Sequence, residues 1–378
     1  MNLQKKWTSL VAVVISVCVG LVFGEVLLRY ALPQPLGVWS QTRDGLNLLR
    51  PSFNGYMHKF HTHVHTNALG FRDVEHDLES SKGGTYRILL LGDSFMEALQ
   101  VEFEESFPHL LEEELNKILP CRVEVINAGV SGWGTDDQVT YFSRRGRELH
   151  PNLVLFAFTL HNDISDNLEE RYHLREGEIL RPKPVTEASL FRHWSLEIRS
   201  YMISHSHLYQ LAYQSWKSMG AAEAGSRLTE HVVELMMVEP GAKVKNGWWI
   251  TKQLLAEANR LSKLGGAQMA AFPIPLIYQV DGRAYAELLA TYQLSEGQLD
   301  PNNPRAMLLH ILEEENIPRI DILPEFLRYI STSGGQPLYI RGDGHWNRIG
   351  HQVAASAVSR QVADIIRHSD SPEIHCSK

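Results

Sequence analysis

One serine in this sequence lies where chemistry is usually done in α/β proteins. Residues 87–91 form a mostly apolar run, typical of a buried parallel strand, and Gly92, Asp93 and Ser94 follow it directly. Ligands of open α/β sheets gather at the carboxyl ends of such strands. A serine hydroxyl there can act as a nucleophile once a base removes its proton, although a serine after a turn is also a common helix N-cap. Ser94 therefore needs partners elsewhere in the chain before it can be given a catalytic role.

Three later blocks supply candidate partners in a fixed order. Residues 127–134 form a glycine-rich loop, in which backbone N–H groups can approach a ligand or simply make a tight turn. Asn162 follows the buried run 153–158, where a side-chain amide can donate to an oxyanion or form an Asx turn. Asp343 and His345 come last, and an acid beside a histidine supplies a base and the group that orients it.

Taken together, the four blocks resemble those of the SGNH, or GDSL-type, hydrolase family, in a membrane-anchored bacterial form. The resemblance covers about residues 87–366, and the joint occurrence of the blocks in order is far more specific than any one of them. It implies a nucleophile, a base, an acid that orients the base, and an oxyanion hole that includes the backbone N–H of the nucleophile. The positions that match these roles are, in that order, Ser94, His345 and Asp343, with Gly129 and Asn162 completing the oxyanion hole.

Two positions depart from the family pattern. Gly342 stands where the family has its acid, three residues before the histidine, whereas Asp343 stands two residues before it. This Asp-x-His spacing is similar to that of alginate O-acetyltransferase-like relatives. Glycines on both sides of the acid, Gly342 and Gly344, would let the loop bend until the carboxylate meets the imidazole. Leu160 stands where the third block of the family carries a glycine, so we expect extra bulk in the pocket at that point.

These residue types suit acyl transfer from an ester. Histidine is a suitable base because its ordinary pKa is about 6.5, and each oxyanion donor contributes on the order of 3 kcal/mol in related sites. We expect a serine esterase that removes O-acetyl or similar short acyl groups, from an envelope carbohydrate. The alternatives are an O-acetyltransferase that modifies a cell-surface polysaccharide, and a catalytically silent binding or scaffold protein on the same fold. A complete Ser, Asn, Asp and His set counts against the silent alternative.

The N-terminus has the pattern of a single membrane span. Lys5 and Lys6 precede the apolar residues 7–28, which contain one acid, Glu25, near the far end, and about 20 residues suffice to cross a bilayer. Positive residues before a span predict a cytoplasmic N-terminus and a catalytic domain that faces the periplasm or the cell exterior. No small-x-small cleavage site follows the span, so an uncleaved anchor is favoured over a signal peptide.

Composition agrees with a folded enzyme behind that anchor. The 378 residues are 44% hydrophobic and 21% charged, which is enough for a sizeable core. The net charge of −8 argues against nucleic acid as a partner. The resemblance implies an acylated small molecule or carbohydrate as the substrate, and the N-terminal span predicts contact with a membrane. Cys18 lies in the span, so Cys121 and Cys376 remain as a candidate disulfide in an oxidising compartment.

No cofactor or metal is expected from the motifs. The sequence has no paired Cys/His motif with zinc spacing. His61, His63 and His65 alternate, so on a strand they would share one face and could bind a metal. No acid accompanies them in the run, and an exposed edge strand is the favoured interpretation.

The order of the expected elements predicts a three-layer α/β/α sandwich with a doubly wound parallel sheet, similar to flavodoxin. We expect an anchor over 1–31, a leading segment over 32–84, and a hydrolase domain over 85–370 with a helical insertion at about 164–246. The expected strands are 87–91, 123–127, 153–158, 268–273 and 319–323, and the expected helices are 107–119, 135–149, 248–264, 301–315 and 348–367.

Aromatic residues are frequent in the expected insertion. Their helical spacing favours a buried core over a sugar-binding platform. The residues concerned are Trp194, Tyr201, Tyr209, Tyr213 and Trp216.

Overall fold

The structure of this chain is a computed structural model, and contacts divide it into two compact units. The helical unit consists of Met1–Asn47 and Pro184–Gly225, and the sheet unit consists of Leu48–Lys183 and Ser226–Lys378. This grouping joins part of the expected insertion to the expected anchor. The residues described are 2–34, 36–42, 46–57, 59–77, 84–160, 163–167, 173–175, 178–180, 194, 198–199, 201–203 and 205–368.

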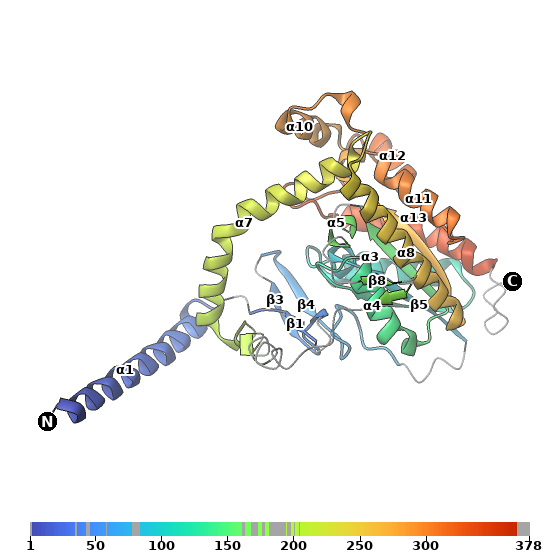
Figure 1. Ribbon diagram of the computed structural model, residues 1–378. Helices are drawn as coiled ribbons and strands as arrows, with labels where there is room; N and C mark the ends of the chain where they lie inside the picture. The colour runs from blue at the N-terminus through green and yellow to red at the C-terminus, as the bar shows by residue number, and fades with distance from the viewer. Residues whose placement is uncertain are drawn as a thin grey trace. The chain divides into compact units, whose positions relative to one another are not determined.

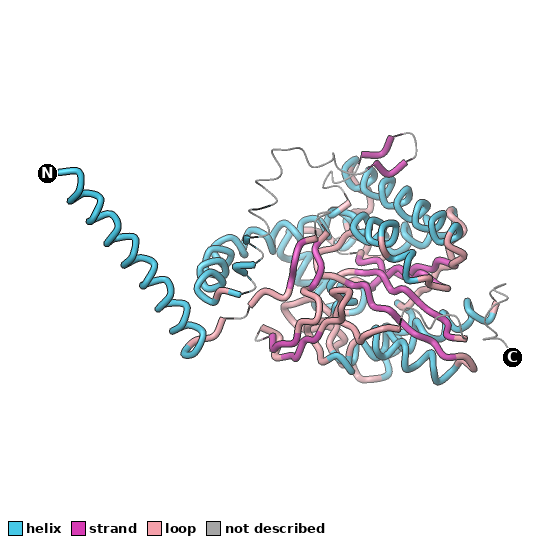
Figure 2. The backbone as a smooth tube through the Cα atoms, turned by 90° about the horizontal axis from the view of Figure 1, so that it is seen from below, coloured by secondary structure: helices cyan, strands magenta, loops and turns pink. Residues whose placement is uncertain are grey.

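Four parallel strands form the central sheet of the sheet unit, with helices on both sides of it (Figure 2). Their spatial order is β10-β7-β5-β6, so the first of them in the chain lies inside the sheet. This order is that of a doubly wound sheet, and ligands of such sheets bind where the order reverses, beside the first strand. The predicted fold class is confirmed. The strands are β5 (Thr85–Gly92), β6 (Arg122–Gly129), β7 (Leu153–Thr159) and β10 (Gln268–Ile274).

Alternate residues of each strand face opposite helix layers. On β5, Ile88 and Leu90 are fully buried in one cluster with side chains of two long helices, whereas Leu89 faces Gly146 on the other side. The first face carries α3 (Phe107–Ile118), α12 (Leu323–Thr332) and α13 (Arg348–Arg367), and the second carries α4 (Thr135–Arg144), α8 (Ala242–Leu264) and α11 (Asn303–Glu314) (Figure 1).

Two expected elements are shorter than predicted. The helix expected over 135–149 ends at Arg144, because Arg145 has a non-helical φ of −137°, and the chain continues as the 3₁₀ turn η3 (Gly146–Leu149). A Cβ at Gly146 would stand 2.9 Å from Leu89 Cδ2, so a glycine allows this turn to pack closely on β5. The strand expected over 319–323 is reduced to one bridge, between Arg319 and Ala271. Helix α12 begins directly after it, with a proline in its first turn that favours a helix start.

Shorter helices and strands complete the sheet unit. The strand expected in the histidine run is β4 (Thr62–His65), which pairs with β3 (Asn54–Met57) in a two-stranded antiparallel hairpin, but His61 lies before this strand at a φ of +58°. Thr62 Oγ1 donates to Leu99 O at 2.7 Å. His61 and His63 are exposed. The elements are β2 (Asn47–Leu49), β3 (Asn54–Met57), β4 (Thr62–His65), α2 (Ser94–Glu97), η2 (Phe103–Glu105), α5 (Asp163–Asp166), β8 (His173–Arg175), β9 (Glu178–Leu180), α9 (Ile277–Val280), α10 (Gly282–Tyr292) and η4 (Glu296–Gln298).

The described cysteines differ in state. Cys121 forms a disulfide bond, whereas Cys18 is a free and exposed thiol. Cys376, the expected partner of Cys121, lies outside the described residues.

The helical unit contains the apolar N-terminal helix α1 (Asn2–Ala31) and the short strand β1 (Trp39–Gln41). The window Trp7–Ala31 has a mean hydropathy of 2.6 and none of it is buried, so it is long and apolar enough to cross a membrane. A second long helix, α7 (His207–Met236), begins in this unit and continues beyond Gly225 into the sheet unit.

The predicted aromatic core of the insertion is wrong. Trp194, Tyr201 and Trp216 are 67%, 63% and 67% exposed, and Tyr209 and Tyr213 are only half-buried. Helical spacing gathers side chains on one face of a helix, but it does not say whether protein, water or lipid meets that face.

Candidate active site

Ser94 lies directly beyond the carboxyl end of the inner strand β5. Gly92 ends the strand, and the buried Asp93 caps helix α2, because its carboxylate accepts from the Phe95 N–H at 3.0 Å. Burial raises the pKa of Asp93. Since Asp93 supplies the cap, the half-buried Ser94 hydroxyl is not needed for capping and is directed to another group.

The hydroxyl of Ser94 meets the imidazole of His345. Ser94 Oγ lies 2.7 Å from His345 Nε2, and His345 Nδ1 lies 2.5 Å from Asp343 Oδ1. A neutral imidazole that donates from Nδ1 to the carboxylate presents an unprotonated Nε2 to the serine. The side chains of His345 and Asp343 are 23% and 24% exposed, so solvent and small molecules can reach them. The three residues therefore form a continuous hydrogen-bonded relay.

The carboxylate of Asp343 is held in its charged form. Its hydrogen bond with His345 lowers the pKa of Asp343 below the usual range, and the positive charge of Lys59 acts in the same direction. An ionised acid at Nδ1 stabilises the imidazolium that forms when Nε2 takes a proton.

Two glycines bend the loop that carries the acid and the base. Gly342 and Gly344 have φ angles of +78° and +86°, a backbone region that favours glycine. The Ile340 carbonyl accepts from the N–H groups of Asp343 at 3.2 Å and Gly344 at 3.1 Å, and Ile340 N donates to His345 O at 2.8 Å. The expectation that these glycines allow an acid two residues before the histidine to reach it is confirmed.

Aromatic packing fixes the position of the imidazole. The ring of Phe95, next to the serine, lies 4.9 Å from the His345 ring and 5.1 Å from that of Trp346. Trp346 is fully buried, and Phe326 also lies against it at 5.6 Å. Asn347 then caps α13, because its side chain accepts from the Gly350 N–H at 3.0 Å. The base is thus anchored to the core on one side and to a capped helix on the other.

Gly129 serves the packing of the serine helix. A Cβ at this position would stand 2.3 Å from Met96 Cβ and 2.9 Å from Glu97 N, so only glycine lets α2 approach β6 this closely. Its N–H donates to Asn127 Oδ1 at 3.0 Å. The predicted donation from Gly129 to an oxyanion would require this bond to break, and it stays a prediction.

The glycine-rich loop is tied to the same helix through a buried acid that the sequence motifs did not single out. Glu97 is fully buried at the end of α2 and accepts from the Ser131 N–H at 3.2 Å and from the Ser131 hydroxyl. Gly132, with a φ of +80°, has open space where a Cβ would be. A glutamate within the otherwise apolar stretch after Ser94 was the one available sign of this contact.

The third block is only partly visible. Asn162, the predicted amide donor, lies outside the described residues, as does His161. On either side of them Leu160 and Asp163 are fully buried, and the Asp163 carboxylate accepts from the Thr159 N–H at 3.0 Å. The strand β7 and the start of α5 are therefore fixed, and the role of Asn162 stays a prediction.

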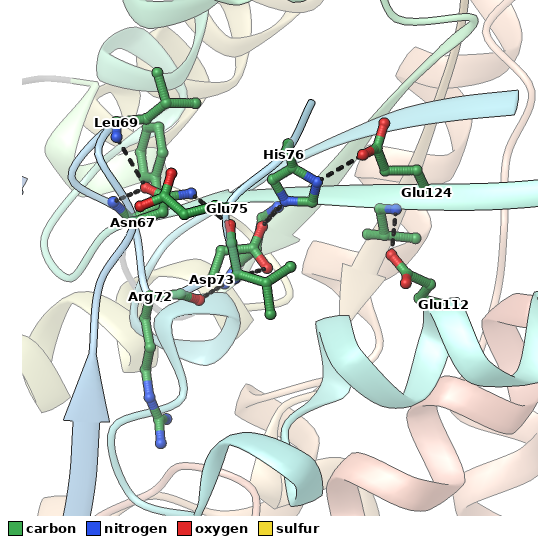
Figure 3. Close-up of polar contacts among 12 residues, drawn as sticks. Asn67, Leu69, Arg72, Asp73, Glu75, His76, Glu112 and Glu124 are labelled. Carbon is green, nitrogen blue, oxygen red and sulfur yellow. Dashed lines mark hydrogen bonds and ion pairs between the residues drawn. The ribbon is translucent and has the colours of Figure 1, made fainter. Parts of the chain in front are cut away.

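A buried polar network supports β6 from the side of the leading segment (Figure 3). His76 Nε2 lies 2.8 Å from Asp73 Oδ2, and His76 Nδ1 lies 2.9 Å from Glu124 Oε1. Glu124 Oε2 also accepts a hydrogen bond from Arg87 Nε at 2.7 Å. Burial lowers the pKa of His76, but the hydrogen bonds from Asp73 and Glu124 outweigh it and raise the pKa to about 10. His76 is therefore charged at neutral pH.

The same network reaches the serine helix through Asn127. Asp73 Oδ2 accepts from the Asn127 N–H at 2.7 Å, and Asn127 Nδ2 donates to Met96 O at 3.0 Å and to Arg72 O at 3.1 Å. In Figure 3 the Asn67 carboxamide also closes the preceding turn by accepting from the Leu69 N–H at 3.1 Å. Asn127 thus links the leading segment, β6 and α2 by hydrogen bonds.

Metal ligation has no candidate among the described residues. No group of three or more His, Cys, Asp or Glu side chains within the described ranges is placed to hold an ion. The polar side chains around Ser94 instead form hydrogen bonds with one another.

Comparison with known proteins gives matches among solved structures alone. No family model and no curated protein matches the sequence. TesA is 13% identical, with a TM-score of 0.38, over 73% of this chain and 97% of that one. The acetyl xylan esterase AlAXEase is 13% identical, with a TM-score of 0.40, over 74% of this chain and 99% of that one. A putative lipolytic protein of the G-D-S-L family from Desulfitobacterium hafniense is 11% identical, with a TM-score of 0.37, over 73% and 98%.

The order of the four sequence blocks, the doubly wound sheet and the serine at the end of its first strand are features of this chain itself. In these features the chain resembles the SGNH, or GDSL-type, hydrolases.

Proposed function

We propose that this protein is a serine esterase that cleaves carboxylic esters with Ser94, His345 and Asp343. One observation carries the proposal: Oγ of Ser94, both ring nitrogens of His345 and Oδ1 of Asp343 form one relay, with distances of 2.7 and 2.5 Å. A serine, a base and an acid in this geometry are the parts that nucleophilic acyl transfer requires.

Acylation begins at the serine. Ser94 Oγ attacks the ester carbonyl carbon while His345 Nε2 takes the hydroxyl proton. The imidazolium is stabilised by the ionised Asp343, whose depressed pKa keeps it charged. The negative charge on the carbonyl oxygen is met by the Ser94 N–H, a first-turn helix donor with no acceptor of its own inside the helix. His345 then gives its proton to the departing alcohol.

Deacylation repeats these steps with a second acceptor. Water, or the hydroxyl of a sugar, loses its proton to His345 Nε2 and attacks the acyl carbon. The bond from that carbon to Ser94 Oγ then breaks, Oγ takes the proton back from His345, and the acid or a new ester is released. The amide of Asn162 is the further donor that we propose for the oxyanion. For the N–H of Gly129 to join it, that group would have to leave Asn127 Oδ1.

We propose short acyl groups, such as acetyl, on envelope carbohydrate as the substrate. The alternative acceptor is a sugar hydroxyl, which would make the protein an O-acetyltransferase. The specific observation in favour of that alternative is the two-residue spacing of Asp343 and His345, which is shared with alginate O-acetyltransferase-like relatives.

The location proposed for this chemistry is the outer side of a membrane. Lys5 and Lys6 precede a helix that is long and apolar enough to span a bilayer. A periplasm-dependent reporter fused after Lys378 should therefore be active, and the full-length chain should remain with the membranes after a carbonate wash. A trimmed, soluble product would turn the anchor into a signal peptide.

The function is tested with the purified full-length protein in detergent, using p-nitrophenyl acetate with and without an acetylated or unacetylated oligosaccharide. An esterase releases acetate without any sugar, the unacetylated sugar does not change this rate, and the acetylated sugar loses its acetyl groups. A transferase releases p-nitrophenol faster when the unacetylated sugar is present, and the sugar gains acetyl groups. A folded protein with no turnover in either arm would favour the silent scaffold and contradict the proposal.

A further inference from the structure

The end of helix α1 is bonded to the start of helix α7. The Glu25 carboxylate accepts from three groups there: Ser206 Oγ at 2.8 Å, His207 N at 3.0 Å and Leu208 N at 2.9 Å. The first backbone N–H groups of a helix have no partner within the helix, so Glu25 acts as a cap supplied from another helix. Arg29 pairs with Glu25 at 3.2 Å and also donates to His205 O at 2.9 Å.

The segment that follows α1 continues this attachment. Gln34 N donates to His207 Nδ1 at 2.8 Å, and Gly37 N donates to Ile203 O at 3.0 Å. A Cβ added at Gly24 would stand 3.7 Å from Leu208 Cδ2, so the two helices approach each other closely at this point. The described residues of 24–37 and 203–208 therefore form one bonded structure within the helical unit. A signal peptide cleaved after α1 would take Glu25, the cap of α7, with it.

The depth of this structure in a bilayer follows from the length of α1. Crossing the hydrocarbon core takes about 20 residues, and about 20 residues counted from Trp7 end at Val26. Glu25 and Arg29 then lie where the hydrocarbon gives way to the headgroups. The residues that they bind, 205–208, lie at the same level.

Large apolar side chains are exposed on both sides of these bonds. In the segment around the start of α7, Trp194, Ile198, Tyr201 and Trp216 are 67%, 56%, 63% and 67% exposed. Beyond the end of the span, Tyr30 is 83% exposed. Tryptophan and tyrosine are the residues that gather at membrane interfaces, because their rings are apolar and carry one polar group.

Positive charge accompanies these aromatic residues. The exposed guanidinium of Arg199 lies over the ring of Tyr213, at 5.3 Å from its centroid. A cation beside aromatic rings suits the anionic phosphates of lipid headgroups.

We propose that Trp194, Ile198, Tyr201 and Trp216 lie in the interface of the same bilayer that α1 crosses, inserted among the lipid headgroups. The occupant of this apolar surface is lipid because the surface is continuous with the end of the span. The inference rests on the proposal that α1 is an uncleaved anchor, and it is independent of the esterase chemistry.

The test uses quenching of tryptophan fluorescence by brominated lipids in vesicles that contain the full-length protein. Trp7 lies in the span, so the experiment is carried out with W7F. Bromines near the ester end of the acyl chain should quench part of the emission of W7F, and bromines near the chain end should quench less. The additional double substitution W194F/W216F should abolish this shallow quenching. The control is W249F, which removes a tryptophan of the sheet unit that is 52% exposed and should leave the quenching unchanged.

The outcomes separate this inference from the two proposals that precede it. Shallow quenching that is lost with W194F/W216F and kept with W249F supports it. An anchored W7F protein without shallow quenching, or with quenching that W194F/W216F does not reduce, overturns it and leaves the anchor and the esterase intact. A protein found soluble and trimmed at its N-terminus overturns the anchor and this inference together. Loss of ester turnover in the wild type bears on the proposed function alone.

Discussion

The two units treat apolar side chains in opposite ways. In the sheet unit Ile88, Leu90 and Trp346 are fully buried between a sheet and its helices. In the helical unit Trp194 and Trp216 are each 67% exposed, and none of the apolar window of α1 is buried. The same residue types are therefore buried in one unit and exposed in the other. One unit excludes water by packing on itself, and the other leaves large apolar side chains exposed, a surface that we propose is covered by lipid.

Their charged groups differ in the same way. The sheet unit encloses complete ion pairs, of which His76 with Asp73 and Glu124 is the most buried. In the helical unit Glu25 instead satisfies the backbone N–H groups at the start of a helix. Substitutions in the sheet unit should therefore change catalysis or folding, and those in the helical unit should change membrane contact.

The largest effect is expected at the nucleophile and the base. Ser94→Ala and His345→Ala should each lower kcat for p-nitrophenyl acetate by up to ~10⁶-fold, and the double variant should lose little more, because a triad acts as a unit. Carbonate-resistant membrane attachment should be unchanged in each variant. Turnover within about tenfold of wild type in either variant would remove the residue from the mechanism.

The next effect concerns the acid. Asp343→Asn should lower kcat by as much as ~10⁴-fold with little change in KM, because the amide favours the wrong tautomer of His345. Asp364→Asn is the matched control, since its carboxylate is 66% exposed and pairs only with Arg367 on the surface of α13. A kcat for Asp343→Asn close to that of the control would show that another group orients the base.

A stability effect is expected at the buried histidine. His76→Gln should lower the free energy of unfolding by about 3–5 kcal/mol, because it leaves the buried carboxylate of Asp73 without the cation of His76 and leaves Glu124 with Arg87 alone. His310→Gln, at a histidine that is 63% exposed, should change the free energy of unfolding by less than about 0.5 kcal/mol. Urea unfolding followed by circular dichroism measures both.

The free energies of unfolding of wild type and His76→Gln should depend differently on pH. The pKa of His76 is raised to about 10 in the folded protein, so the native state holds a proton that the unfolded chain releases above about pH 6.5. The contribution of His76 to stability is complete below pH 6.5 and is lost as pH rises to 10. The free energy of unfolding of wild type should fall over that range more steeply than that of His76→Gln. Equal slopes would mean that His76 is not charged in the folded protein.

The smallest effect separates backbone strain from catalysis. Gly344→Ala and Gly334→Ala both place a side chain at a positive φ, +86° and +72°, with open space around the new Cβ. Each should cost about 1 kcal/mol of stability. Gly344→Ala should also lower kcat about tenfold, because it shifts the Asp343–His345 loop, while Gly334→Ala leaves kcat unchanged. Equal kcat values would show that the loop tolerates the shift.

Much of the sheet unit was predictable from the sequence because its signals are local. An apolar run ending in glycine fixed the place of Ser94, and Asn347 marked the start of α13 at the observed residue. The order of the blocks then predicted that His345 and Asp343 would reach a serine 251 positions away from the histidine.

The other features of the site and of the insertion depend on contacts between residues far apart in the sequence, which local patterns do not predict. The motif predicts Gly129 as an oxyanion donor, which stays a prediction, but it does not reveal that a glycine is needed there for close contact with Met96. Glu97 and Asn127 hold the loop and the serine helix through contacts with Ser131 and Met96, and neither motif nor periodicity predicts such pairs. The aromatic residues of the insertion have the spacing of a core, but spacing carries no information about the solvent that they meet.

The most direct test of the central claim is covalent labelling of the nucleophile in the full-length membrane protein. A fluorophosphonate ester reacts only with a serine activated by a base, and peptide mass spectrometry locates the adduct. The account predicts one adduct, on Ser94, in wild type, and none at that position in His345→Ala. An unlabelled Ser94 in folded wild-type protein, or an adduct on Ser94 that forms equally fast in His345→Ala, would contradict it.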